Sequence, residues 1–449
     1  MPRVLNGVCS IAALFAVMLG GAPGAGAGDD LAAAARDAYI YAFPLHEMYR
    51  IRYQALYQPA NPQRAAVNRF LHRRELSDHT SRRVTTPNND TIYSSAFLDL
   101  SQGPLVLDVP DIADRYYSLA FMDFYTNNFA YVGTRTTGGQ AGKYVIAGPG
   151  WKGAGLPEGS RLIASPTNAV WLLGRFLVAD ASDLPNAHRL QDKLKLEPLA
   201  ASDTPIFDGP AIDPNDAWNY FAVVNHALTQ NPPPERDAAM VARMAAIDVG
   251  PGQRFDAGRF DETQQKALLA GIADAKRLIA AKSLSGKVVN GWAYGVPGVG
   301  NFATDYLLRA AVALKGLAAL EPAEAIYLTY VGTPLDGSTA YRLHFDADRF
   351  PPVTAFWLLS IYQIMPDGRL FFADNPIRRY SIGDRTPGLR RNADGSLDLY
   401  IQQASPPAAD RSNWLPAPAG PLSLILRAYL PRPALIDESY APPVLERQP

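Results

Sequence analysis

Residues 422–430 read LSLILRAYL, and this stretch indicates the kind of fold that the chain adopts. Leucine or alanine stands at every even position, whereas Ser423, Ile425, Arg427 and Tyr429 stand between them. Successive side chains of a β-strand point to opposite faces, so the pattern predicts a strand with one face in a sheet core. An arginine on a sheet face is costly unless it meets a carboxylate or a ligand anion. Arg427 is therefore a candidate ligand-binding residue, with a structural salt bridge as the alternative.

Strand-like runs surround this stretch from about residue 325 onward. The pairs Asp336-Gly337, Asp367-Gly368 and Asp394-Gly395 lie between such runs and predict hairpin turns. A second β-sandwich, in the form of a jelly roll, accounts for this pattern.

An earlier region, residues 91–180, also has a period of two. Its short runs are rich in aromatic and β-branched residues, and pairs such as Gly103-Pro104 separate them. The runs cover residues 93–98, 105–109, 116–122, 129–134, 143–146 and 170–178. They predict an antiparallel sandwich or barrel.

Helical spacing occurs in two places. Residues 30–57 have apolar side chains three and four apart, and Pro44 is expected to kink or end that helix. Amphipathic segments return between about residues 184 and 320. The predicted fold class is thus mainly β with a helical insert. The predicted divisions are 1–27 (signal peptide), 28–182 (helix plus β-sandwich), 183–320 (helical domain) and 321–449 (jelly-roll domain).

The composition is that of a globular protein without a basic surface. The chain has 449 residues, 48% of them hydrophobic, and 42 lysine and arginine residues stand against 43 aspartate and glutamate residues. This balance gives no basis for binding nucleic acid or anionic membranes.

The first 27 residues have the features of a secretory signal. Arg3 is the only charged residue there, residues 11–19 are apolar, and Ala25-Gly26-Ala27 matches the small-x-small cleavage pattern. The apolar run is too short to span a bilayer. We expect a periplasmic or secreted protein without a transmembrane segment after cleavage. Its single cysteine, Cys9, lies in the signal, so no disulfide is expected.

The densest polar stretch is TPNNDTIY at residues 86–93. Asn88, Asn89 and Asp90 just before a strand can fix a sharp turn through side-chain to backbone hydrogen bonds. Alternatively they point into a cleft, where an amide orients a polar ligand and Asp90 acts as a base or a cation ligand, with Tyr93 as a wall.

A second polar cluster, DFYTNN at residues 123–128, lies between two predicted strands. Asp123, Tyr125 and Asn127, with Arg135 nearby, offer an aromatic face beside polar groups, as a sugar requires. A hairpin loop flanked by core tyrosines is the alternative. Because loops at one end of a sandwich gather in space, the two clusters are predicted to share one pocket, with Asp90, Asp123 and Arg135 as candidate catalytic residues.

The sequence gives little support for a metal site, a cofactor site or a known catalytic motif. Six scattered histidines, no two of them four residues apart, disfavour a histidine metal site, and no cofactor is predicted. The motifs G-x-S-x-G, H-E-x-x-H and the Walker loop are absent. In the C-terminal half, Arg379 is a further candidate ligand-binding residue.

Many short blocks of the sequence resemble two paired families. Residues 39–57, PNNDTIYS at 87–94, and residues 98–100, 115–117, 133–138 and 148–151 resemble domain-of-unknown-function family 1254. Residues 334–337, 352–357, 375–376, 379–383, 394–396, 413–418 and 442–443 with Arg447 resemble family 1214, its usual C-terminal partner. The resemblance implies an immunoglobulin-like β domain, a helical domain and a jelly roll similar to those of peptide-N-glycosidases. It brings no established activity and no catalytic residue.

Three functions therefore remain open. One is a hydrolase that acts on a polar or glycan-like substrate in the cell envelope. Another is a non-catalytic periplasmic binding protein for such a ligand. The third is a structural envelope component, for which a homo-oligomer is expected.

Overall fold

The computed structural model describes residues 27–448, apart from residues 63, 83, 84, 154, 202 and 204. Helix α1 (Ala27–Leu56) begins at Ala27, the first residue of the chain that the structure describes. The predicted signal peptide, residues 1–27, lies outside the described residues except for Ala27, and so does Cys9. No helix in the described part combines the length and the apolar character needed to cross a membrane.

The N-terminal β unit consists of two sheets. Sheet I has the order β1-β2-β8-β4-β5, and sheet II has the order β7-β6-β3-β9. Their facing residues form one hydrophobic core that includes Ile92, Leu107 and Phe176. The strands are β1 (Leu71–His72), β2 (Thr91–Asp99), β3 (Leu105–Val109), β4 (Tyr117–Asp123), β5 (Asn128–Gly133), β6 (Gly142–Ala147), β7 (Arg161–Ala164), β8 (Ala169–Leu177) and β9 (Lys195–Pro198).

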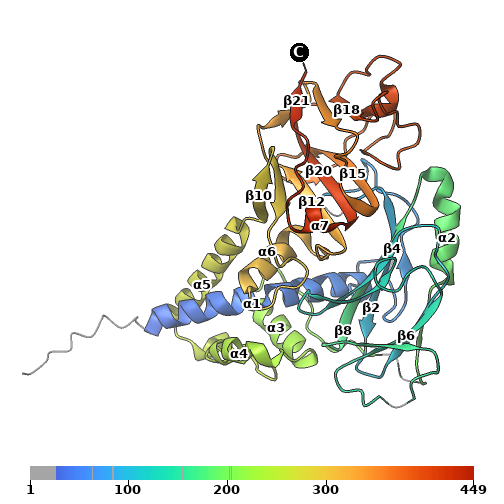
Figure 1. The fold of residues 1–449 in the computed structure, drawn as a ribbon. Helices are drawn as coiled ribbons and strands as arrows, with labels where there is room; N and C mark the ends of the chain where they lie inside the picture. The colour runs from blue at the N-terminus through green and yellow to red at the C-terminus, as the bar shows by residue number, and fades with distance from the viewer. Residues whose placement is uncertain are drawn as a thin grey trace, which may run out of the picture.

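This unit extends beyond the predicted boundary at residue 182. Strand β9 pairs with β3. Helix α2 (Leu184–Lys193) contributes Ala187 to the same core and lies on the outer side of the unit in Figure 1. The boundary is therefore corrected to lie after residue 198, because burial of α2 and pairing of β9 both tie them to sheet II.

A helical core forms around α1. Apolar residues of α1, α3 (Asn219–Gln230), α4 (Ala238–Ala245), α5 (Glu262–Ala281) and α6 (Tyr306–Gly316) make one cluster. Figure 1 shows these helices gathered along α1. Pro44 lies inside α1, which continues to Leu56. The predicted end of the helix at Pro44 is therefore not observed, since packing on all sides holds the segment together.

The C-terminal β unit also has two sheets with a shared core. Sheet III has the order β10-β11-β12-β20-β15-β16, with β13 paired to β20 and β17 paired to β15, and sheet IV has the order β19-β18-β14-β21. The strands are β10 (Ser285–Val289), β11 (Trp292–Gly295), β12 (Ala325–Tyr330), β13 (Leu335–Asp336), β14 (Tyr341–Phe345), β15 (Val353–Ile364), β16 (Leu370–Phe371), β17 (Ser381–Gly383), β18 (Leu397–Gln402), β19 (Trp414–Pro416), β20 (Pro421–Pro431) and β21 (Leu445–Arg447). A short helix, α7 (Pro433–Ile436), follows β20. Because β10 and β11 belong to sheet III, the predicted boundary at residue 321 is also corrected.

Two sequence predictions for this unit need revision. Only Asp367-Gly368 joins strands that pair with each other, β15 and β16. Strand β13 pairs with β20 while β14 pairs with β18, so Asp336-Gly337 is no hairpin. In β20, residues 422, 424, 426 and 428 face the core as predicted, but Leu430 has a φ of 49° and packs on the opposite side.

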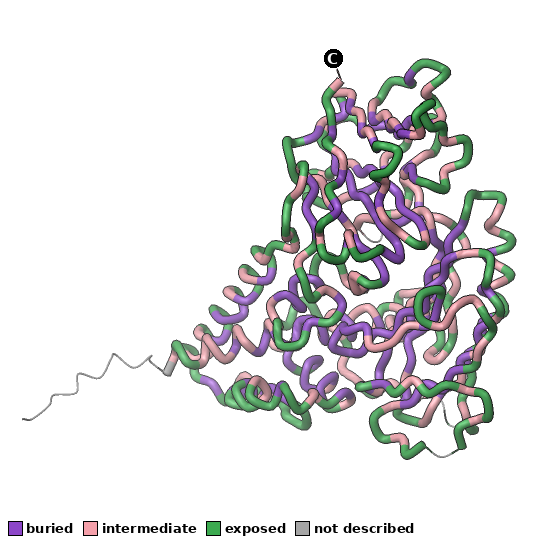
Figure 2. Tube along the Cα trace, in the orientation of Figure 1, coloured by how far each residue is buried: buried purple, intermediate pink, exposed green. Residues whose placement is uncertain are grey.

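The two β units pack on each other through the faces that point away from their own cores. Tyr116, Ala120 and Leu177 of the N-terminal unit share a cluster with Leu358 and Tyr429 of sheet III. We call this contact region the inter-sheet layer. In Figure 2, buried residues follow the strands on both sides of it, whereas exposed residues gather in loops.

Candidate functional site

The loop before β2 reaches across the inter-sheet layer and binds sheet III. The Asn88 side chain accepts a hydrogen bond from the Asp90 N–H at 2.7 Å, which closes the predicted turn. The same amide donates to the Tyr429 hydroxyl at 2.7 Å. The Ser381 hydroxyl lies 3.0 Å from Asn89 Oδ1 and 3.1 Å from Asp90 Oδ1. Two roles were predicted for residues 88–90: fixing a turn or facing a ligand. The structure is compatible with both, since Asn88 fixes the turn and Asp90 faces the layer.

Arg427 lies on the same side of sheet III, 5% exposed. Its guanidinium donates to Ser360 Oγ at 2.5 Å and to the Thr86 carbonyl at 3.1 Å. It also lies over the rings of Tyr327 and Tyr362. The predicted salt bridge is absent, because no carboxylate of the described residues is within 4.0 Å. Arg427 is thus a buried cation with neutral acceptors.

Arg175 lies on the face of sheet I that packs against sheet III and is 7% exposed. It pairs with Tyr93 on β2 and Ser118 on β4, and its guanidinium lies 5.7 Å from the centre of the half-buried Tyr93 ring. Nη2 donates to the Ala318 carbonyl at 3.0 Å. Tyr327 on β12 is the register partner of Arg427 on β20, and its ring centre lies 6.5 Å from that of Tyr429.

Polar atoms without a partner gather at this end of sheet I. Asp90 Oδ2, Thr91 Oγ1, Ser118 Oγ and Arg175 Nη1 are buried and have no hydrogen-bond partner among the described residues. Most buried polar groups in proteins are hydrogen-bonded, and each one left unpaired costs about 1–3 kcal/mol. A group of such atoms on neighbouring strands is therefore the strongest indication of a ligand site in this structure.

Two carboxyl groups at this site, those of Asp90 and Asp384, have a pKa above the usual value for aspartate. Burial raises the pKa of Asp90 to about 6, although Arg427 and the Ser381 hydroxyl oppose the shift. The nearby charge of Asp384 adds to it. Burial also raises the pKa of Asp384 to about 6, against a hydrogen bond from the Trp357 N–H. Both groups can therefore take up or release a proton near neutral pH.

Arg135 lies at the rim of the layer. It forms an ion pair with Glu324 at 2.6 Å and lies over the Tyr131 ring. Glu324 also accepts a hydrogen bond from the Tyr116 hydroxyl at 2.8 Å. Arg135 is thus engaged in joining the two β units, and the structure does not bring it to Asp123.

The predicted shared pocket of Asp90 and Asp123 is wrong. The Asp90 carbonyl accepts a hydrogen bond from Val178, whereas Asp123 pairs with Val170 on the same strand. Eight residues of strand separate these positions, which corresponds to about 26 Å. Two carboxylates at that distance cannot cooperate at one glycosidic bond. The two loops flank opposite ends of sheet I, so the assumption that they gather at one end failed.

Asp123 stabilises its own turn, as the structural alternative predicted. Its Oδ1 accepts the N–H groups of Tyr125 and Asn127, each at 2.9 Å. Burial raises the pKa of Asp123 to about 6 against these hydrogen bonds. The Tyr125 hydroxyl donates to the Asn231 carbonyl, and its ring lies beside the Arg309 guanidinium in the helical core. Tyr125 and Asn127 are thus remote from the inter-sheet layer.

Arg379 serves a local structural contact. Its Nη1 donates to the carbonyls of Ser412 and Trp414, both at 2.8 Å, and so holds the segment before β19. The role of Arg379 in ligand binding stays a prediction.

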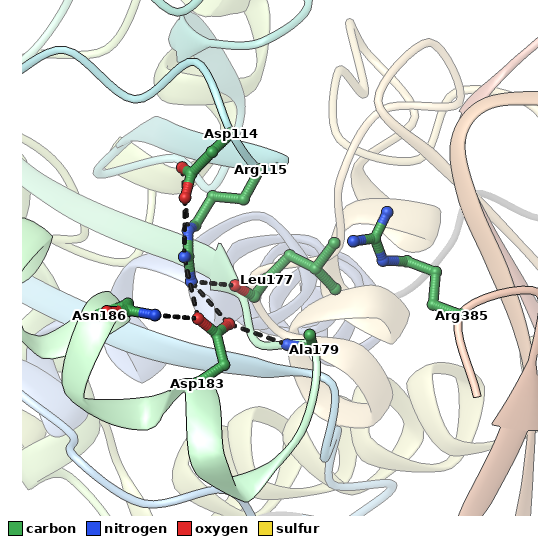
Figure 3. A pocket seen from close by; sticks show the side chains of 7 residues that line it. All are labelled: Asp114, Arg115, Leu177, Ala179, Asp183, Asn186 and Arg385. Atoms are coloured by element: carbon green, nitrogen blue, oxygen red, sulfur yellow. Dashed lines mark hydrogen bonds and ion pairs between the residues drawn. The ribbon is translucent and has the colours of Figure 1, made fainter. Parts of the chain in front are cut away.

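A hollow of about 220 Å³ opens beside the Asp90 end of sheet I. Leu177, which pairs with Thr91, forms part of its wall. Figure 3 shows Arg115 held between Asp114 and Asp183, with the Arg385 side chain approaching Leu177 from the C-terminal β unit. The hollow therefore lies where the two β units meet.

Four residues near this site were not singled out from the sequence: Arg175, Ser118, Tyr327 and Asp384. Arg175 had a usable signal, since it is the only charged residue in the strand-like run 170–178. The cost of burying an arginine applies to it as it does to Arg427. The others are ordinary strand or loop residues that only packing brings together. Among the described residues, no group of three or more His, Cys, Asp or Glu is arranged to hold a metal ion.

One comparison with a solved structure agrees with this architecture. A protein from Vibrio parahaemolyticus, VPA0106, has a crystal structure that matches with a TM-score of 0.72 and 26% identity, over 94% of this chain and all of that one. A putative uncharacterized protein from Burkholderia cenocepacia matches with a TM-score of 0.45 and 12% identity, over 94% of each chain. A search of the curated proteins finds no match. The family "protein of unknown function (DUF1254)" matches residues 67–198, and "protein of unknown function (DUF1214)" matches residues 324–433. The N-terminal β unit therefore matches the DUF1254 family, and the C-terminal β unit matches the DUF1214 family.

Proposed function

We propose that this protein is an exported cell-envelope protein that binds a small polar, glycan-like ligand in the inter-sheet layer. The observation that carries this proposal is the group of unpartnered buried atoms at Asp90, Thr91, Ser118 and Arg175. A ligand with hydroxyl groups supplies the missing hydrogen bonds, and aromatic rings such as Tyr93 suit the apolar face of a sugar.

Ligand-dependent stabilisation tests this function. The protein is screened by thermal unfolding against neutral sugars, sugar acids, polyols and amino acids. A ligand at a hundred times its Kd adds about 2.7 kcal/mol to the free energy of unfolding. We expect at least one compound to raise the unfolding temperature of the wild type, and to do so less in the double variant Thr91→Val/Ser118→Ala.

Tyr125→Phe is the matched control, because it removes a hydroxyl at the opposite end of sheet I. It is expected to retain the full ligand effect. A panel without any stabilising compound, or an equal effect in the double variant, contradicts the proposal.

Hydrolysis of a glycan-like substrate is the second candidate function, favoured by Asp90 and Asp384. Glycosidases use two carboxyl groups, one of them with a raised pKa. Asp90 has an unpartnered Oδ2 and a pKa of about 6, and Asp384 is close enough to affect it. Release of reducing ends from a polysaccharide panel tests this candidate. Asp90→Asn and Asp384→Asn should each abolish release while ligand binding persists, and a wild type that releases nothing contradicts it.

Export is supported by the sequence of residues 1–27. Helix α1 begins at Ala27, so cleavage after that residue leaves nearly the whole helix in place. Protein recovered from the periplasm or medium is expected to begin near Gly28. N-terminal sequencing that returns Met1 contradicts export with cleavage.

We also propose a fold type for each of the two β units. The paired sheets with mostly antiparallel strands support an immunoglobulin-like N-terminal unit and a jelly-roll C-terminal unit.

A further inference from the structure

Two buried guanidiniums face the inter-sheet layer without a carboxylate partner. Arg427 donates to a serine hydroxyl and a backbone carbonyl, and Arg175 donates to a backbone carbonyl. Within the described residues, no carboxylate oxygen lies within 4.0 Å of either group. Buried charges are normally paired, because neutral acceptors do not balance the loss of hydration. The layer therefore favours an anionic group.

Asp90 lies close enough to Arg427 for the arginine charge to act on it, so Arg175 is the guanidinium that has no carboxylate nearby among the described residues. Glu324 is held by Arg135 and the Tyr116 hydroxyl. Asp90 lies three residues along β8 from Arg175, because its carbonyl is bonded to Val178. That separation corresponds to about 10 Å. Neither group neutralises Arg175 at contact distance.

Arg175 and Ser118 offer adjacent donors for an anion. They are register partners on β8 and β4, so their side chains leave the same face of sheet I next to each other. Arg175 Nη1 and Ser118 Oγ are both buried and unpartnered in the described structure. A guanidinium N–H and a hydroxyl side by side are suited to the two oxygens of a carboxylate.

We infer that the ligand of the inter-sheet site is a uronic acid or a short oligomer of one, whose carboxylate binds Arg175 and Ser118. This inference rests on the proposed function and adds the class of ligand. At the other end of the site, Asp90 Oδ2 and Thr91 Oγ1 receive ligand hydroxyl groups. The half-buried ring of Tyr93 lies beside its register partner Arg175 and provides apolar contact for the sugar ring.

Comparison of an acid with its neutral ester tests the inference. Calorimetric titration of the full-length mature protein uses digalacturonate, its methyl ester and lactose as probes. The ester keeps the hydroxyl groups and loses the charge. We expect digalacturonate to bind at least tenfold more tightly than the ester or lactose.

Substitutions of single residues then test where the carboxylate of the bound acid lies. Arg175→Gln is expected to weaken digalacturonate binding at least tenfold and to leave binding of the ester almost unchanged. Ser118→Ala is expected to weaken the acid severalfold, and it decides the question if Arg175→Gln does not fold. Arg161→Gln, which removes an exposed arginine on β7, is the control and should change neither.

The outcomes separate the inference from the proposed function. Equal affinity for acid and ester, or an acid whose binding is unaffected by Ser118→Ala and Arg175→Gln, overturns the inference and leaves a neutral-ligand site standing. Absence of binding by digalacturonate overturns the inference, while the wider thermal screen decides on the proposed function.

Discussion

At Asp90, burial and neighbouring charges act in opposite directions on one carboxyl group. Burial disfavours the carboxylate, whereas Arg427 and the Ser381 hydroxyl favour it, and the pKa settles at about 6 instead of its usual 3.8. At Asp123, the hydrogen bonds from Asn127 are the main opposition to burial, with further contributions from the Arg309 charge and the Tyr125 N–H. The two groups thus reach a similar acidity through different surroundings.

The raised pKa of Asp90 has a consequence for stability. Between pH 4 and 6 the folded protein binds more protons at Asp90 than the unfolded chain, so the free energy of unfolding falls as the pH rises. We expect Asp90→Asn to remove this contribution, at most about 3 kcal/mol between pH 4 and 7. Urea unfolding at a series of pH values measures it. Asp108→Asn, which changes a surface ion pair with Lys143, is the control, and equal pH dependence in both variants and the wild type contradicts the pKa.

The hydroxyl groups of Thr91 and Ser118, which have no hydrogen-bond partner in the described structure, lead to a second prediction for single residues. Thr91→Val and Ser118→Ala each remove a buried hydroxyl that has no partner in the described structure. We expect the free energy of unfolding to stay constant or to rise by about 1 kcal/mol, because an unsatisfied polar group is lost. Denaturant unfolding of the ligand-free protein checks this. A loss of more than about 2 kcal/mol means that the hydroxyls stabilise the fold and are not reserved for a ligand.

Among the elements, α1 is the one around which the other helices are arranged. Its contact with α5 is so close that a Cβ on Gly271 would lie 2.1 Å from the Ala32 carbonyl oxygen. Glycine is required at this position because two helix backbones meet there, and not because of its backbone angles. At the end of α6, by contrast, a Cβ on Gly316 would have no neighbour within 4 Å.

These two glycines form a matched pair for mutation. Gly271→Ala is expected to lower the free energy of unfolding by about 1–3 kcal/mol, because the added methyl group overpacks the α1–α5 contact. Gly316→Ala is expected to be neutral or to stabilise by up to about 1 kcal/mol, since alanine is the better helix former. Thermal or denaturant unfolding distinguishes them. Equal effects of the two substitutions would show that the helices can separate at little cost.

For the whole molecule, the contact between the two β units is both the candidate site and a major structural joint. The loop at residues 86–90 docks on sheet III, and Glu324 connects the Tyr116 hydroxyl and Arg135 to the segment before β12. Glu324 is 1% exposed, so its charge depends on these partners. The proposed ligand site and the contacts that join the two units therefore lie in the same layer.

Removal of Glu324 is expected to loosen this joint. Glu324→Ala leaves Arg135 and the buried Tyr116 hydroxyl without their acceptor, and breaking a buried pair in this way costs about 3–5 kcal/mol. Arg135→Ala should cost less, since the half-exposed arginine leaves Glu324 still bonded to Tyr116. Denaturant unfolding followed by tryptophan fluorescence measures both. If Glu324→Ala costs no more than Arg135→Ala, the buried acceptor does not stabilise the joint.

The sequence by itself determined the local elements and the family. Alternation of side chains predicted β2, β3 and most of β20, and helical spacing predicted α5, because these patterns depend on neighbours along the chain. The fixed blocks identified DUF1254 and DUF1214. Asn88 and Asp90 were recognised for the same reason, as a local turn with polar side chains.

Only the tertiary structure decided which polar residues meet. Both β2 and β4 run antiparallel to β8, so Asp90 before the start of β2 and Asp123 at the end of β4 lie at opposite ends of sheet I. Docking of sheet III brought Arg427 close enough to Asp90 for its charge to lower the pKa of that carboxyl group. Arg175 became significant because the face that carries it is covered by a second β unit. Strand order and the packing of faces depend on contacts between residues far apart in sequence, and periodicity along the chain carries no information about them.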